Sequence, residues 1–142
     1  MEEYLEIFQS AYNARKAINL LSEDTINSLL EDIARETELR MHYIISENEK
    51  DLQRMSKDNP QYDRLMLTEE RIRGIVGDIR NVIKLSSPIS RTIGENVHQN
   101  GMRIRKEIVP FGVIGVVYEA RPNVSFDVFS LCFKTKNVCI LK

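Results

Sequence analysis

The stretch that decides the fold runs from residue 113 to residue 141 and reads VIGVVYEARPNVSFDVFSLCFKTKNVCIL. Its two ends, residues 113–117 and 138–141, are unbroken apolar runs rich in β-branched side chains. Such runs are typical of parallel strands that are covered on both faces. Residues 124–133 between them are compatible with a helix. The order strand, helix, strand predicts a βαβ unit with a right-handed crossover.

The turn inside this unit holds the residues that we single out first. Pro122 has a restricted φ and disfavours helix at Arg121, so the first strand must end in a turn. Asn123 then falls near the N-cap of the helix, and on spacing alone the simpler interpretation is that Asn123 caps it. Gly112 and Gly115 do not form a GxGxxG fingerprint, so a standard dinucleotide loop is absent from this stretch.

Upstream, residues 1–92 are predicted to be helical. Apolar residues recur at three- and four-residue spacing over residues 4–18, 26–45 and 72–82, which predicts three amphipathic helices. Ser22 and Thr68 are the predicted N-caps of the second and third.

Three shorter signals divide this helical region. Residues 46–49 read SENE, which has the form of a capping box and predicts that a short helix restarts there. Asn59-Pro60 breaks the pattern, and the sequence SSP at residues 86–88 ends the last helix.

Residues 93–109 predict a β-hairpin. Asn100-Gly101 is a strong turn dipeptide because both residues tolerate positive φ. After it, apolar residues alternate with charged ones over residues 102–108, as in a half-exposed strand. The expected fold class is therefore α/β: an N-terminal helical layer, a hairpin, and from residue 110 to residue 142 the start of an α/β domain. Because two strands cannot cover each other's faces, we expect this last domain to be truncated.

Composition restricts the class of protein. The chain is 42% apolar and 29% charged with a net charge of −1, as in an ordinary globular protein, so nothing global attracts nucleic acid or anionic membrane. No apolar stretch is long enough for a membrane span, and the N-terminus lacks the features of a signal peptide. A cytoplasmic location is expected. Basic residues outnumber acidic ones after residue 100, which would suit either an anionic ligand or a solvated surface.

The two cysteines, Cys132 and Cys139, are expected to be inert. Their spacing matches neither a redox CxxC pair nor a zinc-ligand pair, and both lie among apolar residues. With only His42 and His98 besides, no metal site is predicted.

Residues 109–124, VPFGVIGVVYEARPNV, closely resemble the corresponding stretch of the gamma-glutamyl phosphate reductase family, within the aldehyde dehydrogenase superfamily. The string YEARPN at residues 118–123 separates this family from general aldehyde dehydrogenases. The resemblance continues to residue 141 and extends weakly to residues 63–68 and 101–103.

The resemblance implies an aldehyde-dehydrogenase-like nucleotide-binding domain in residues 110–142 and a hairpin that serves as an oligomerisation arm of a homo-oligomer. It implies NADPH-dependent reduction of L-glutamyl 5-phosphate to L-glutamate 5-semialdehyde and phosphate in proline biosynthesis, with glutamate kinase as a pathway partner. In that family a cysteine attacks the acyl phosphate before hydride transfer. Neither Cys132 nor Cys139 matches that cysteine, so the chain alone is expected to be inactive.

Residue by residue, Asn123 matches the amide that holds the oxyanion in this superfamily. The backbone at Glu119 and Ala120 would line the NADP cleft, and Lys142 would lie beside the adenosine ribose. Arg121 would attract the acyl phosphate or the glutamate carboxylate, or else form a structural ion pair.

This sequence departs from the family at two positions and leaves one rival interpretation. Lys136 replaces a glycine that suits a left-handed helix cap, so we expect Asn137 to take that conformation. Lys142 stands where the family more often has arginine. The rival from another class is a non-catalytic helical interaction module, in which the turn around Asn123 is only structural.

Overall fold

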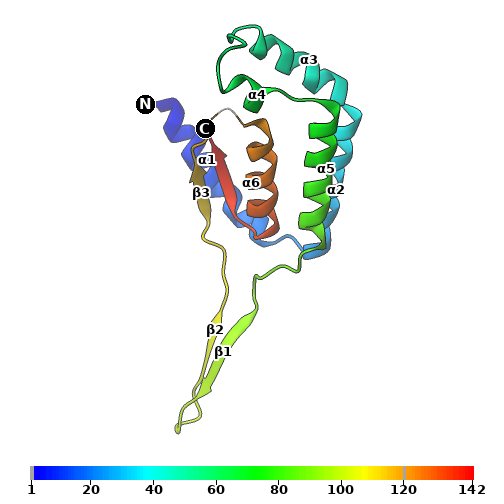
Figure 1. The fold of residues 1–142 in the computed structure, drawn as a ribbon. Coiled ribbons are helices and arrows are strands. Elements are labelled where there is room, and N and C mark those ends of the chain that lie inside the picture. Colours follow the sequence, from blue (N-terminus) through cyan, green and yellow to red (C-terminus); the bar gives the residue numbers. More distant parts are fainter. Residues whose placement is uncertain (1, 120) are drawn as a thin grey trace.

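The computed structural model describes residues 2–119 and 121–142, and the order of helices and strands follows the α/β prediction (Figure 1). The helices are α1 (Glu2–Asn19), α2 (Glu23–Leu39), α3 (Met41–Leu52), α4 (Tyr62–Leu65), α5 (Glu69–Lys84) and α6 (Pro122–Lys134). The strands are β1 (Thr92–Val97), β2 (Arg103–Glu107), β3 (Val113–Val116) and β4 (Val138–Leu141).

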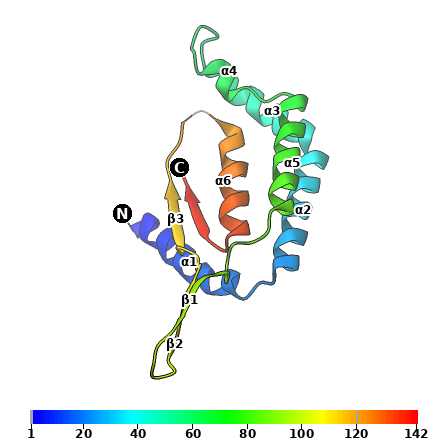
Figure 2. The ribbon, with the colours of Figure 1, turned by 60° about the horizontal axis from the view of Figure 1, so that its bottom comes forward.

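The main core lies between α2, α5 and α6. Both ribbon views place α6 between the small sheet and the α2–α5 pair (Figures 1 and 2). The buried side chains of the core come from the predicted apolar stripes: Ile26, Leu30, Ala34, Ile75, Val76 and Ile79. Phe126, Phe129 and Phe133 of α6 pack against this cluster, which joins the two halves of the chain.

Both predicted N-caps of these helices are confirmed. The hydroxyl of Ser22 accepts a hydrogen bond from the Thr25 amide at 3.1 Å, and that of Thr68 accepts one from the Arg71 amide at 3.2 Å. Each bond satisfies one of the N–H groups that the first turn of a helix leaves unpaired.

The second stripe of apolar residues does not form one helix. The chain bends at Arg40 (φ −95°, ψ 14°), where α2 ends and α3 begins. The predicted restart at Ser46 is wrong, because Ser46 lies inside α3 and its hydroxyl donates to the Tyr43 carbonyl at 2.8 Å. A serine inside a helix can satisfy its hydroxyl on the preceding turn and then has no capping role.

The bend aims the buried Asn48 of α3 at the segment between α4 and α5. Its side chain donates to the Leu65 carbonyl at 2.9 Å and accepts from the Leu67 amide at 2.7 Å. These two bonds fasten a stretch of irregular backbone that lines the cavity described below.

The hairpin extends away from the rest of the chain (Figure 1). Strands β1 and β2 pair antiparallel, and the predicted turn is confirmed. Only Gly101 of the predicted dipeptide has positive φ (84°), and its amide donates to the His98 carbonyl at 2.9 Å. The prediction of a half-exposed strand is wrong. Every residue of β2 is exposed, because no other layer of the described structure covers the hairpin.

The predicted βαβ unit is confirmed. Strands β3 and β4 pair in parallel, with Val113 opposite Val138 and Val116 opposite Leu141, and α6 connects them. Helix α6 lies against one side of this sheet, and α1 also contacts both strands. The expected full burial is not reached, because Val113 and Gly115 are exposed and every residue of β4 is only half-buried.

The end of α6 corrects the expectation for Asn137. Lys136 itself takes the left-handed conformation (φ 55°). The Lys136 amide donates to Phe133 at 3.0 Å and the Asn137 amide donates to Cys132 at 2.8 Å, the two bonds of a Schellman motif. Asn137 is buried instead, and its side-chain oxygen accepts from the Gly112 amide at 2.9 Å.

Within residues 2–119 and 121–142, no helix combines the length and the apolar character that crossing a membrane requires.

Candidate functional site

The candidate residues gather where β3 and β4 end and α6 begins. The ladder continues past both strands, since the Tyr118 amide donates to the Lys142 carbonyl at 2.9 Å and the Lys142 amide donates to Val116 at 3.0 Å. Glu119 and Arg121 follow in the connection to α6. Carboxyl ends of parallel strands are the usual ligand-binding edge of α/β proteins.

Asn123 does not cap α6. The helix starts at Pro122, whose restricted φ suits a first helical position, and Arg121 is the N-cap residue. Asn123 is therefore the second helical residue, and its side chain is exposed. Among the described residues its amide has no hydrogen-bond partner, which leaves the amide free to donate to a bound molecule.

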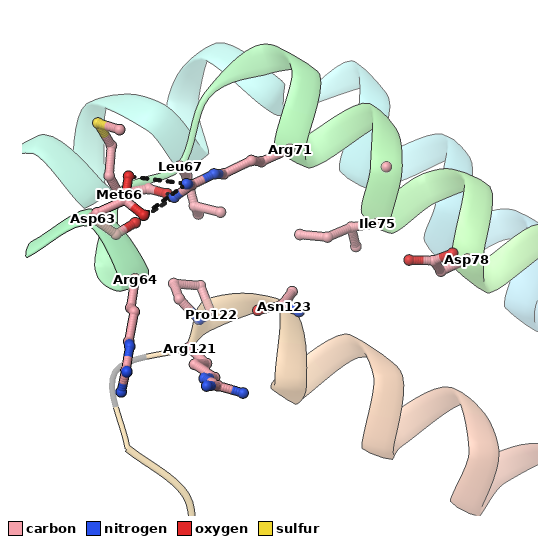
Figure 3. Close-up of a pocket in the computed structure, with 11 residues that line it drawn as sticks. Asp63, Arg64, Met66, Leu67, Arg71, Ile75, Asp78, Arg121, Pro122 and Asn123 are labelled. Atoms are coloured by element: carbon pink, nitrogen blue, oxygen red, sulfur yellow. Dashed lines mark hydrogen bonds and ion pairs between the residues drawn. The ribbon is translucent and has the colours of Figure 1, made fainter. Parts of the chain in front are cut away.

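Asn123 forms part of the wall of an open cavity of about 380 Å³ between α4, α5 and the start of α6 (Figure 3). Its polar lining consists of Asp63, Arg64, Arg71, Asp78, Arg121 and Asn123. The apolar floor is made by Leu67, Ile75 and Pro122 among others. The cavity therefore combines charges of both signs with an amide donor.

One pair of charges in this cavity has a structural role. The Arg71 guanidinium bonds both carboxylate oxygens of Asp63, at 3.1 and 3.2 Å, and also bonds the carbonyls of Asp63 and Met66. These contacts hold the α4 segment against the start of α5 and leave Asp63 and Arg71 with their own partners.

The other charged side chains differ. In the part of the chain that the structure describes, Arg64, Asp78 and Arg121 form no ion pair, and all three are exposed. The structural ion pair that was one reading of Arg121 is therefore not seen among these residues. Asp127, one turn into α6, has a pKa raised first by partial burial and then by the charge of Asp78.

The predicted cofactor residues lie outside the cavity lining. Glu119 is exposed, and its carboxylate accepts a hydrogen bond from the Gln61 side chain at 2.8 Å. Lys142 is exposed, with its ammonium 5.6 Å from the centre of the Tyr4 ring. Ala120 lies outside the described residues. The structure thus brings Arg121 and Asn123 into one cavity and places Glu119 and Lys142 at the edge of the sheet.

The sequence analysis did not single out Arg64 and Asp78, which also line the cavity. Arg64 lay within the weakly similar stretch 63–68, which was a usable signal. Asp78 gave none, because a charged residue between Ile75 and Ile79 is what the solvent side of an amphipathic helix ordinarily carries.

The two cysteines have the properties of structural thiols. Burial raises the pKa of both Cys132 and Cys139, so each stays protonated at neutral pH and is a poor nucleophile. No group of three or more metal-binding side chains occurs in the described ranges.

Comparison with known proteins confirms the resemblance. A gamma-glutamyl phosphate reductase of Bacteroides fragilis is 57% identical over 137 residues, 96% of this chain and 33% of the relative. One of Bacteroides thetaiotaomicron is 57% identical over 135 residues, 95% of this chain and 32% of the relative. The chain spans about a third of the length of these curated relatives. A scan against family models found no match.

Solved structures agree on the fold. The gamma-glutamyl phosphate reductase of Thermotoga maritima superposes with a TM-score of 0.91 at 28% identity, over 96% of this chain and 34% of that one. The enzyme of Saccharomyces cerevisiae gives 0.84 at 27% identity, over 94% and 36%. These matches support the α/β assignment.

Proposed function

We propose that this chain, which belongs to the gamma-glutamyl phosphate reductase family over the third of its relatives that it spans, is part of an enzyme that reduces L-glutamyl 5-phosphate. The products are L-glutamate 5-semialdehyde and phosphate, and NADPH supplies the hydride when it is bound. The observation that carries the proposal is similarity along almost the whole chain to enzymes of that name. The attacking cysteine belongs to residues outside this chain.

Asn123 is the catalytic group that this chain contributes. When the nucleophile adds to the acyl carbon, the carbonyl oxygen gains negative charge, and the Asn123 amide donates to that oxygen. Three observations support the role: the amide is exposed, it lacks an intramolecular partner among the described residues, and it lies in the first turn of α6. The positive end of a helix dipole adds to stabilisation of an anion there.

NADP fits the edge formed by β3 and β4. The Lys142 ammonium is exposed beside the last strand, where a cation suits the additional phosphate of NADP. The exposed backbone turn at Glu119 flanks the same edge, and the side chain of Glu119 is held to one side by Gln61.

The test is Asn123→Ala in the complete enzyme. An interaction made mainly in the transition state lowers kcat, and loss of one oxyanion donor costs on the order of 10²–10³ in rate. The KM for NADPH should stay nearly unchanged. Steady-state kinetics with each substrate varied in turn measure both constants.

Asn123→Asp sharpens this test, because it keeps the size of the side chain but sets a negative charge against the oxyanion. We expect it to be at least as slow as the alanine variant. Near-normal turnover in the aspartate variant would contradict the role of Asn123. Asn13→Ala, on the exposed side of α1, is the matched control and should leave kcat unchanged.

A further inference from the structure

Two arginines line the cavity beside Asn123 without a counterion of their own. Arg64 comes from α4 and Arg121 is the N-cap residue of α6, so two separate segments supply the charges. Both side chains are exposed, and neither forms an ion pair with another described residue. By contrast, Arg71 in the same cavity bonds both carboxylate oxygens of Asp63, at 3.1 and 3.2 Å. The cavity therefore holds two cations that can bind an anion from outside the chain.

Figure 3 shows how these cations lie relative to Asn123. In this view the side chains of Arg64 and Arg121 lie on one side of Asn123, and Asp78 lies on the other side. The carboxylate of Asp78 repels an anion from its own side of the cavity. Two guanidinium groups repel each other when no anion lies between them, and each presents several N–H donors to an oxyanion. The cavity therefore favours an anion on the arginine side.

The position of Asn123 decides which anion of the substrate fits there. The inference rests on the proposed function, in which the Asn123 amide holds the acyl oxygen of L-glutamyl 5-phosphate. The phosphate is joined to that acyl carbon through a single oxygen, whereas two methylene groups and the α-carbon separate the α-carboxylate from it. With the acyl group at Asn123, the phosphate is thus the substrate anion beside Arg121. A phosphate group carries about −1.5 to −2 charges at pH 7, which suits two guanidinium groups.

We propose that Arg64 and Arg121 bind the phosphate of the acyl phosphate and stabilise it as the leaving group. When the cysteine thiolate from outside this chain adds to the acyl carbon, the acyl oxygen becomes the oxyanion at Asn123. Collapse of this intermediate re-forms the carbonyl and breaks the bond between the acyl carbon and the bridging oxygen. The electron pair of that bond stays on the phosphate, whose negative charge rises by one until it takes up a proton from water. The two guanidinium groups stabilise this added charge.

The test uses the complete enzyme in the reverse direction, with glutamate 5-semialdehyde, NADP and inorganic phosphate. In this direction the aldehyde gives NADPH and the thioester before phosphate releases the acyl group. The variants are Arg64→Ala, Arg121→Ala and Arg64→Lys, with Arg35→Ala in a surface ion pair of α2 as the control. Two measurements separate the steps: kcat/KM for each of the three substrates, and the rate constant of the NADPH burst in the absence of phosphate.

Each alanine variant should lower kcat/KM for phosphate by about ten- to a hundredfold, because it removes charge-assisted hydrogen bonds to the dianion. The values for the aldehyde and NADP, and the rate constant of the burst, should change little, since these steps precede the binding of phosphate. A variant that folds poorly lowers all three kcat/KM values equally, so their ratios do not depend on the amount of folded enzyme. Arg64→Lys keeps the charge and should recover part of the loss. Arg35→Ala should leave every ratio unchanged.

An unchanged ratio between the values for phosphate and aldehyde in both alanine variants would overturn the inference. A loss confined to the aldehyde would also overturn it, because the arginines would then bind the glutamate carboxylate, and so would a loss confined to NADP. Each of these results leaves the proposed function standing, provided that the unmodified enzyme oxidises glutamate 5-semialdehyde in the presence of phosphate. If the unmodified enzyme does not oxidise this aldehyde, the proposed function itself fails.

Discussion

The α2–α5 pair and the β3–β4 sheet both have apolar patterns in sequence but differ in how far the chain covers them. In the helical pair, Ile26, Leu30 and Ile79 are almost completely buried against each other and against α6. In the sheet, Val113 stays 37% exposed, and Val117 just beyond β3 is 84% exposed. The first half of α1 resembles the sheet, with Phe8 55% exposed.

The difference shows what an apolar pattern records. An apolar pattern indicates how much burial a segment is suited to. The helices and strands that pack against the segment determine how much of its surface is buried. Helices α2 and α5 are covered by each other and by α6, whereas a two-stranded parallel sheet contacted by α1 and α6 stays partly exposed. The relatives, about three times as long as this chain, have further residues that can cover such surfaces.

The largest expected effect contrasts one core leucine with one exposed leucine. Leu30→Ala removes a side chain that is 0% exposed and should lower the free energy of unfolding by about 2–5 kcal/mol. Leu20→Ala makes the same chemical change at a position that is 87% exposed and should stay within about 0.5 kcal/mol. Urea denaturation of this chain measures both. Similar losses at the two sites would mean that the helical core is not the stable part.

The next effect tests the contact between the end of α6, which leads into β4, and the α2–α5 pair. The buried Lys134 ammonium at the end of α6 donates to Glu23 at 3.0 Å, Asn27 at 2.7 Å and the Ile83 carbonyl at 3.2 Å. Lys134→Met leaves these groups without their donor and should lower the free energy of unfolding by about 1–3 kcal/mol. Lys84→Met, at an exposed position of α5, is the control and should have little effect.

The dependence of stability on acid pH tests the same contact between Lys134 and Glu23. The pKa of Glu23 is lowered from its ordinary value of 4.5, first by the bond from Lys134 and then by the Ser87 amide. A carboxylate with a lowered folded-state pKa adds stability above pH 4.5, and this contribution is lost as the pH falls through the folded pKa. Lys134→Met should weaken this loss below pH 4.5. An unchanged acid profile would argue against the pairing.

A smaller effect, of opposite sign, is expected at Lys136. Its left-handed conformation costs a residue with a β-carbon about 1 kcal/mol relative to glycine. Lys136→Gly should therefore raise the free energy of unfolding by about 1 kcal/mol. Lys136→Ala separates strain from the bond between the Lys136 ammonium and the Asn19 carbonyl, because alanine loses that bond and keeps the strain. Equal stability of the glycine and alanine variants would contradict the strain argument.

The smallest change in stability is expected at the exposed sheet. Val117→Ser should alter the free energy of unfolding by less than about 0.5 kcal/mol, because little of the side chain is buried. It should nevertheless reduce self-association of this chain and binding of a hydrophobic dye, since it shrinks an exposed apolar patch. Light scattering over a concentration series measures the first. A chain that is monomeric without the substitution would remove the contrast between the two regions.

Local chemistry predicted much of the fold. Ser22 and Thr68 predicted two helix starts, and Gly101 predicted the hairpin turn. Each of these residues acts through backbone groups within three residues of it. The bend at Arg40 gave no such signal, since the apolar spacing continues through it. That bend brings Asn48 to Leu65 and Leu67, a tertiary contact that no local pattern contains.

The residues of the candidate site also divide into those that a local sequence pattern predicts and those that only tertiary structure brings together. Arg121 and Asn123 lie in one contiguous string, so resemblance alone placed them together. Arg64 and Asp78 come from other segments, and only the arrangement of α4, α5 and the start of α6 around one cavity reveals them. The mistaken cap at Asn123 had a local remedy, because Pro122 already favours the first helical position and shifts Asn123 into the helix.

The bonds of Lys134 also set an order of events during synthesis on the ribosome. Lys134 and Glu23 are 111 residues apart in the chain, so the partner at the start of α2 emerges long before the ammonium that binds it. At ~5–20 residues per second, the delay is roughly 6–22 s. Helices α2 and α5 can pair during that time, whereas α1 must wait for β4, its neighbour from the end of this chain. The apolar side of α1 therefore stays uncovered by β4 until residues 138–141 have been synthesised.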